Sequence, residues 1–410
     1  MSAVEIDLTE LGDTVDRELT LDQGRMLAQS GVVTAVPSAY QPGWWTIGSA
    51  SRIGAVRIGD VVVRIRPKVP IARLLFLLGY SVHGSAWQAS TVSLDESDDL
   101  VPAVAEALWR QVAHAIGQGL LPGYVQVEES SLVLRGRLLE SAQLTRHHGL
   151  LLPLEIRHDE FSVDTAENQI LRTACERMLH VPRVPAPTRA RLLRLRREFG
   201  DVTAIHPGDE IPAWLRTRLN ARYHVALRLA ELVLKATSVE HSAGTVAVNG
   251  FLLAMPQLFE DFVTVALREA LEGVYGGKVA GQSRDYHLDE EDRVSIRPDI
   301  LWRLGGQVVA VADAKYKAEK PAGYPNADLY QLLAYCTVLG LKVGHLIYAK
   351  GNEDPVRHVV RSAGTEIICH ALDLSQPPDM LLAEARTLAR HIHDKSRRPV
   401  ADAPPSLRLR

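Results

Sequence analysis

Three charged residues near the C-terminus, Asp299, Asp313 and Lys315, have the types and spacing of a site that cleaves phosphodiesters. The surrounding segment reads RVSIRPDILWRLGGQVVAVADAKYK over residues 293–317. Its VVAVAD run is continuously apolar before the aspartate, as expected of a strand buried on both faces. Side chains two positions apart on a strand share a face, so Asp313 and Lys315 point the same way. Charges at the end of a buried strand are costly unless they bind each other or a ligand.

The position of Asp299 depends on the register of a hairpin predicted at Gly305-Gly306. With a two-residue loop, Asp299 pairs with Ala312 and faces away from Asp313. With a three-residue loop over residues 305–307, Asp299 pairs with Asp313 and the two carboxylates share a face. Three-residue loops with a left-handed glycine are common, so the second register is accessible. Carboxylates on opposite faces would exclude the site.

Two carboxylates and a lysine suit metal-dependent hydrolysis. Mg²⁺ prefers oxygen ligands and keeps waters that can serve as nucleophile, so Asp299 and Asp313 are the predicted ligands, with Mn²⁺ as a substitute metal. The Ala314 carbonyl is a further candidate ligand. Lys315 would stabilise the charge of the phosphorane or orient and deprotonate the attacking water.

The same residues resemble the P-D…(D/E)-x-K motif of a nuclease superfamily, with Pro298-Asp299 as its first half and Asp313-Ala314-Lys315 as its second. The resemblance implies a restriction-endonuclease-like core. It also implies an accessory acid at Glu260, which would complete the metal shell. Gln331 and Tyr335, four residues apart on a predicted helix, resemble the Q-x-x-x-Y element of some members.

Longer segments resemble the McrC family, the nuclease subunits of modification-dependent restriction systems. The matching segments are IRPKV (65–69), PGYVQVEESSLVLRGRL (122–138), DTAENQILRTA (164–174), LFEDFV (258–263), DAKYK (313–317) and DLYQLLAY (328–335). Their order is more specific than any one of them. The resemblance implies an AAA+ GTPase partner of the McrB type, which recognises methylated double-stranded DNA and translocates, while the N-terminal part of this chain docks on that motor and stimulates it.

Each site residue also has a structural interpretation. Asp299, Asp313 and Lys315 could form a surface salt bridge at the end of the hairpin. Glu260 lies in a first helical turn, where the helix dipole favours an acid in any case. Gln331 and Tyr335 could be the polar edge of an amphipathic helix.

Other polar segments are assigned structural roles first. Lys317 and the arginines of residues 188–200 fit solvated surfaces, although the arginines could track phosphates. The RGR of residues 135–137 fits a strand turn as well as a contact with a partner or DNA. His147-His148 lack a third ligand at metal spacing, which argues against zinc.

The elements that position the site form an α+β and α/β multidomain protein. Residues 1–152 contain short β-rich segments and two helices, at 72–80 and 100–118, and form the predicted docking domain. Residues 153–245 are helical, with prolines in VPRVPAPT interrupting the helices. Residues 246–392 begin with a helix at Pro256 and alternate strands and helices around a mixed central sheet. Residues 393–410 read as a flexible tail.

Composition narrows the function classes further. The chain has 410 residues with 46 Lys and Arg against 49 Asp and Glu, which argues against a generally basic DNA-coating protein. The opening residues show no secretory signal and no run is long enough for a membrane span, so we expect a cytoplasmic protein without membrane contact. Cys175, Cys336 and Cys369 suit free buried thiols. The segment GVYGGKV (273–279) lacks the spacing of a phosphate-binding loop, so this chain should bind no nucleotide itself.

The sequence therefore predicts a Mg²⁺-dependent DNA endonuclease subunit that works with an AAA+ motor. One alternative is a stand-alone repair or mobile-element nuclease. Another is a non-catalytic regulator of an AAA+ ring.

Overall fold

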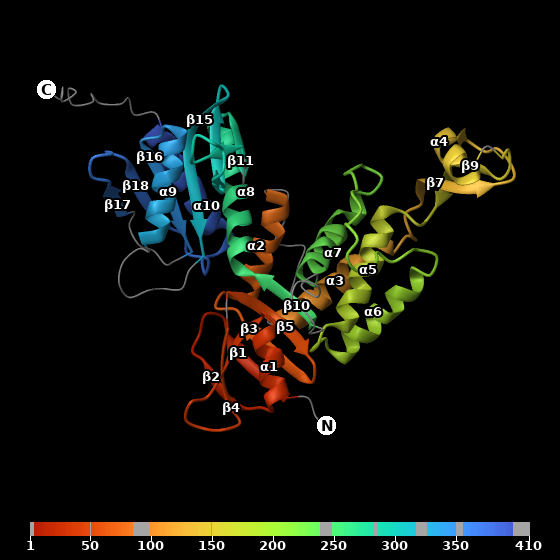
Figure 1. The fold of residues 1–410 in the computed structure, drawn as a ribbon, viewed down its shortest axis with the longest axis horizontal. Coiled ribbons are helices and arrows are strands. Elements are labelled where there is room, and N and C mark those ends of the chain that lie inside the picture. The colour runs from red at the N-terminus through yellow and green to blue at the C-terminus, as the bar shows by residue number, and fades with distance from the viewer. Residues whose placement is uncertain are drawn as a thin grey trace.

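The computed structural model describes residues 4–49, 51–84, 99–148, 150–237, 248–281, 285–316, 326–349 and 356–396. It is a mixed α/β protein of several sheets and helices (Figure 1). No helix in these ranges is long and apolar enough to cross a membrane. Lys317 and the tail beyond residue 396 lie outside the described residues.

Two small sheets form the N-terminal part. The first has the order β1 (Val4–Thr9), β6 (Val61–Arg66), β5 (Arg52–Ile58) and β10 (Val248–Ala254). The second has the order β2 (Val15–Glu18), β4 (Trp44–Ser49) and β3 (Val33–Pro37) and is joined by α1 (Leu21–Gln29). The helix starts at a capping box in which the side chains of Thr20 and Gln23 bond to each other's main-chain N–H groups. Alternating apolar side chains such as Ile6, Ile47 and Ile58 are fully buried in a shared core.

A helical layer follows this part. Its helices are α2 (Ile71–His83), α3 (Leu100–Ile116), α5 (Ala166–His180), α6 (Ala186–Glu198) and α7 (His224–Thr237), with a 3₁₀ turn, η3 (Ala221–Tyr223). The two helices predicted in the first 150 residues are confirmed as α2 and α3. The prolines of VPRVPAPT separate α5 from α6 as predicted, because proline cannot continue a helix.

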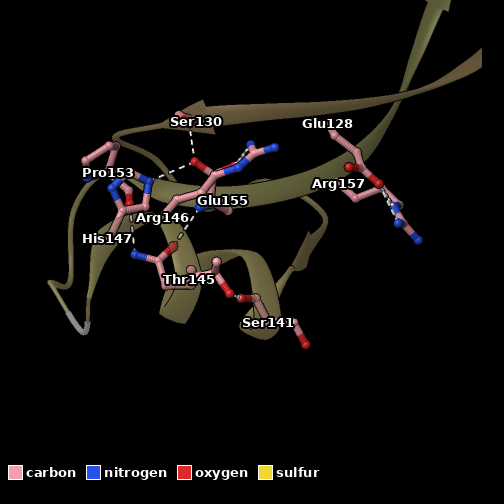
Figure 2. A network of polar contacts seen from close by, with 10 residues as sticks. Glu128, Ser130, Ser141, Thr145, Arg146, His147, Pro153, Glu155 and Arg157 are labelled. Carbon is pink, nitrogen blue, oxygen red and sulfur yellow. Dashed lines mark hydrogen bonds and ion pairs between the residues drawn. The ribbon is translucent and has the colours of Figure 1, made fainter.

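A narrow lobe projects from the helical layer, far from the C-terminal sheet (Figure 1). It contains a sheet in the order β7 (Gly123–Ser131), β9 (Leu154–Ser162) and β8 (Arg137–Leu138), with α4 (Glu140–His147) beside β9. The Glu155 carboxylate lies at the centre of a polar network (Figure 2). It accepts hydrogen bonds from Ser130 and Arg146 and contacts His147 Nε2 at 2.8 Å.

The C-terminal part is built on a mixed sheet. Its order is β11 (Lys278–Gly281), β14 (Ile300–Leu304), β15 (Gln307–Lys315), β16 (Val343–Tyr348), β18 (Glu366–Ala371) and β17 (Val356–Val359). β15, β16 and β18 run parallel and the other pairs are antiparallel. Helices α8 (Met255–Tyr275), α9 (Asn326–Leu339) and α10 (Pro378–Ser396) pack on it, and β12 (Tyr286–His287) pairs with β13 (Ser295–Ile296). The predicted helix at Pro256, hairpin, helix and strand are thus present in that order.

Two of the sheets include strands from both sides of a domain boundary predicted from the sequence. β7 and β9 pair across residues 152/153, and β10 pairs with β5 although it follows residue 245. One large core also runs from α2 and α3 through α7 and α8 to α10. The packing between the regions is therefore continuous. Cys175, Cys336 and Cys369 are buried free thiols, as predicted.

Candidate functional site

A tight turn connects the two strands that carry the motif. Gly305 and Gly306 have φ values of +58° and +86°, as a two-residue type I′ turn requires. Leu304 pairs with Gln307 directly across the turn. The three-residue loop considered from the sequence is therefore not used. Two glycines in the left-handed region favour the shorter loop because its twist matches that of the strands.

A β-bulge corrects the register that this short loop would impose. The pairing runs from Arg303↔Val308 to Trp302↔Ala310, so Val309 is skipped. Beyond the bulge Ile300 pairs with Ala312, which places Asp299 opposite Asp313. Inserting one residue in a strand shifts all later side chains to the other face. The bulge thus brings the two carboxylates to the same side, as the site hypothesis demands.

The two aspartates are buried beside each other. Asp299 is 9% exposed and Asp313 is 2% exposed. Asp299 Oδ2 accepts a hydrogen bond of 3.0 Å from the Ala314 main-chain N–H, which fixes its carboxylate against β15. Burial and the charge of Asp299 raise the pKa of Asp313 to about 7. Burial and the charge of Glu260 raise the pKa of Asp299.

Lys315 supplies the positive charge of the site. Its Nζ lies 2.5 Å from Asp313 Oδ2. Burial alone would lower the pKa of Lys315, but the carboxylates of Asp313 and Asp299 outweigh that effect and raise it. The lysine therefore remains a cation at neutral pH, with its ammonium directed to the site.

Glu260 approaches the site from α8. It is half-buried and, with Asp299, lines a cavity of about 320 Å³ whose other members include Ser81, Asp261, Thr264 and Arg268. Burial raises the pKa of Glu260, and the charge of Lys315 opposes this shift. The helix thus brings a third carboxylate to the mouth of the site, where the sequence placed its accessory acid.

Helix α9 contacts the segment that precedes Asp299. Gln331 Nε2 donates to the Tyr335 hydroxyl at 2.7 Å, and that hydroxyl donates to the Arg297 carbonyl at 3.2 Å. The structure therefore connects Gln331 and Tyr335 in a chain that anchors the segment two residues before Asp299. Burial is the main cause that raises the pKa of Tyr335, and the charge of Asp313 adds to it.

Two further acids near the motif were not found from the sequence. Asp328, in the first turn of α9, is buried, accepts a hydrogen bond from the Tyr348 hydroxyl and contributes to the raised pKa of Lys315. Glu10, in the N-terminal part, is fully buried and accepts a hydrogen bond from Tyr316, the residue after Lys315. An acid in a first helical turn looks ordinary in a sequence. Glu10 offered no local signal, because its partner is 306 residues away along the printed sequence.

The donor set fits a divalent cation that keeps part of its water shell. Asp313 Oδ2 is buried, and its close cationic contact is Lys315 Nζ at 2.5 Å. Within the described ranges, no three His, Cys, Asp or Glu side chains are close enough to hold a metal by themselves. Two carboxylates would therefore need a carbonyl, water or substrate oxygen to complete a shell, which is the usual arrangement for Mg²⁺.

The fold and this pattern define a multidomain α/β protein with paired buried aspartates and a lysine at the end of one sheet strand. The family described as McrBC 5-methylcytosine restriction system component matches residues 48–349. The chain belongs to this family, which confirms the resemblance found in the sequence.

One solved structure shares the fold of this chain, and a second gives a weaker match. A chain from the refined half-complex of the tetradecameric assembly of Thermococcus gammatolerans McrB AAA+ hexamers with bound McrC is 19% identical, with a TM-score of 0.59 over 95% of this chain and 100% of that chain. A chain from the cryo-EM structure of the Thermococcus gammatolerans McrBC complex is 18% identical, with a TM-score of 0.39 over 65% of this chain and 88% of that one. A comparison with curated protein sequences finds no match.

Proposed function

We propose that this chain is the Mg²⁺-dependent DNA endonuclease subunit of a modification-dependent restriction complex. The observation that carries the proposal is the pair of buried aspartates, Asp299 and Asp313, beside the Lys315 ammonium at the end of β15. Burying like charges together is unfavourable unless a cation or proton joins them. A phosphodiester substrate with a divalent cation meets that demand.

The residues divide the work as follows. Asp299 and Asp313 would hold the cation, with the Ala314 carbonyl as a further ligand and Glu260 as the accessory acid that would complete the metal shell. Bound there, Mg²⁺ or Mn²⁺ would supply Lewis-acid polarisation and an activated water. Lys315 donates hydrogen bonds toward the scissile phosphate, where it neutralises the charge that develops on the equatorial oxygens, or orients the water. Tyr335 keeps the Asp299 segment in place through the Arg297 carbonyl.

We further propose that the partner is an AAA+ GTPase of the McrB type, which selects methylated double-stranded DNA. The family match and the neighbour's assembly of McrB hexamers with bound McrC support this partnership. The projecting lobe is the candidate contact within the N-terminal docking region. It exposes large apolar side chains to solvent, which are Leu132, Val133, Leu134, Leu144, Leu150, Leu151 and Leu152. Exposed apolar patches of this kind mark interaction surfaces.

Plasmid cleavage tests both parts of the proposal. Methylated and unmethylated plasmid are incubated with the full chain, with and without the AAA+ protein, GTP and Mg²⁺. We expect cutting of methylated DNA only in the complete mixture, and none with Asp313→Ala. Removing a ligand that stabilises developing charge costs at least about a hundredfold in rate. Glu290→Ala, which removes an exposed carboxylate in the same domain, is the matched control and should cut normally.

Other outcomes of the plasmid assay would favour the two alternative functions. Cutting by this chain without partner and GTP would favour a stand-alone nuclease. Stimulated GTP hydrolysis with no cutting under any divalent metal would favour the non-catalytic regulator. Normal cutting by Asp313→Ala would remove Asp313 from the mechanism.

A further inference from the structure

Arg228 is a largely buried cation. It lies on α7 in a polar stripe with His224, Glu231 and Lys235, yet it is only 8% exposed. In the described part of the chain, no residue forms a hydrogen bond or ion pair with its guanidinium. A buried charge is normally paired because its desolvation is costly. The guanidinium nitrogens are not among the fully buried, unpartnered polar atoms of the described residues, so they face the adjoining cavity, where an anionic ligand could pair with them.

The Arg228 side chain lines a cavity of about 270 Å³ between α7, α8, α2 and the β5–β10 edge. Arg52, Lys235 and Gln257 also line it, and the rest of the wall is largely apolar, including Leu78, Leu252 and Leu258. Two carboxylates also line the cavity, and each accepts a hydrogen bond from a neutral donor. Glu231 accepts from Trp214 Nε1 at 2.8 Å, and Asp261 accepts from Gln257 Nε2 at 2.9 Å.

This cavity adjoins the one that Asp299 and Glu260 of the candidate nuclease site line. Ser81 and Asp261 line both cavities, and Asp299 and Glu260 line the second one only. The wall of the chamber carries three cations, Arg52, Arg228 and Lys235, and two carboxylates, Glu231 and Asp261, and the chamber adjoins the cavity that Asp299 lines. An extended anionic polymer placed across Asp299 would bring a neighbouring anionic group toward Arg228.

We propose that this chamber is a subsite for a phosphate of the DNA backbone, one or more nucleotides from the scissile bond. A guanidinium binds phosphate through two parallel N–H···O bonds, and an apolar wall leaves little water to screen them. Arg228 is the principal contact, and Lys235 and Arg52 add positive charge. The inference rests on the proposed function, since it takes DNA as the substrate of the adjoining site.

DNA binding by the full chain without metal tests the subsite separately from cleavage. Fluorescence anisotropy of a labelled DNA duplex is recorded in EDTA over a range of salt, with every variant built on Asp313→Ala. We expect Arg228→Met to weaken binding about tenfold or more. We also expect it to reduce the slope of log affinity against log salt by about one. Arg228→Lys should recover part of the affinity, and the exposed Arg194→Met on α6 should change neither quantity.

Thermal unfolding separates this effect from misfolding. Because Arg228 is an unpaired buried charge, Arg228→Met should unfold at the same temperature as the parent or higher. If it does unfold early, the exposed Lys235→Ala reports on the same chamber, and a smaller but clear loss of DNA affinity is expected.

Several results would overturn the subsite. The first is a DNA affinity and salt slope in Arg228→Met or Lys235→Ala that equal those of the Asp313→Ala parent. The second is an equal loss of DNA affinity in Arg228→Met and Arg194→Met. The third is a parent chain that does not bind DNA. Thermal unfolding in inorganic phosphate is a further test. If phosphate raises the unfolding temperature of the parent but not that of Arg228→Met, and both proteins bind DNA with equal affinity, the chamber binds a free anion instead of DNA. Loss of cleavage in Asp313→Ala bears only on the proposed function.

Discussion

Asp313 and Glu155 are each 2% exposed, but their surroundings act on them in opposite ways. In the projecting lobe, hydrogen bonds from Ser130 and His147, with the charge of Arg146, lower the pKa of Glu155. In the C-terminal sheet, burial and the charge of Asp299 raise the pKa of Asp313 to about 7, and Lys315 only partly compensates.

The difference matches the two roles that we assign to these carboxylates, since Glu155 holds the lobe together and Asp313 is a proposed cation ligand. Glu155 has donors on both oxygens, and Gln143 ties its main chain to the same network by accepting from the Glu155 N–H at 2.7 Å. Asp313 shares its space with a like charge, which a structural role does not explain. Strongly perturbed groups with a specific charged neighbour are concentrated at functional sites. The contrast therefore supports the proposed functional role of Asp313 by an argument that does not use the motif.

Among the effects that test this comparison, the largest is expected in the lobe. Glu155→Ala removes the acceptor at the centre of its network, so the β7–β9 lobe should open locally and be cut by proteases at least about ten times faster. Limited proteolysis with mass spectrometry of the fragments measures this. Asp159→Ala, which removes an exposed carboxylate from the same strand, should leave the rate unchanged. Equal protection of both variants would mean that the network does not hold the lobe together.

The pH dependence of unfolding sharpens the comparison. The folded-state pKa of Asp313 lies near 7, above its ordinary value of 3.8. Its contribution without metal therefore destabilises the fold progressively as pH rises from about 4 to about 7, and is constant above that range. The lowered pKa of Glu155 acts in the opposite sense. Its contribution is present above the ordinary value of 4.5 and is lost as pH falls.

Thermal melts of the wild type and Asp313→Asn, in EDTA, measure this dependence. The variant should unfold at a higher temperature than the wild type at about pH 8 and at a similar one at about pH 4. Mg²⁺ should raise the unfolding temperature of the wild type more than that of the variant at the higher pH. Parallel curves for the two proteins would show that Asp313 carries no such penalty.

The smallest expected effect concerns the support of Asp299. Tyr335→Phe removes the hydroxyl that donates to the Arg297 carbonyl and accepts from Gln331. The loss of about 1 kcal/mol of positioning energy should slow cleavage about fivefold. Tyr330→Phe, on the exposed side of the same helix, is the control. If Tyr335→Phe cleaves DNA as fast as Tyr330→Phe, the Tyr335 hydroxyl does not position Asp299 and α9 only packs against the sheet.

The sequence by itself determined the local features of this protein. The PD and DAK segments, the Gly305-Gly306 turn, the apolar run of β15 and the stripe of α8 are each encoded within about twenty residues. Residue type and periodicity are sufficient for such features because the interactions that define them are short in sequence. The ordered segments shared with the McrC family identified the family for the same reason.

Only the tertiary structure decided how these pieces combine. The bulge at Val309 sets the register of Asp299, and neither residue type nor spacing predicts where a ladder skips a residue. β9 completes a sheet begun by β7, so the lobe crosses the division expected at residue 152. Arg228 belongs to an ordinary polar stripe of α7 until α2, α8 and β10 enclose it. Pairing, burial and charge environment arise from residues distant in sequence, so they become visible only when the chain has folded.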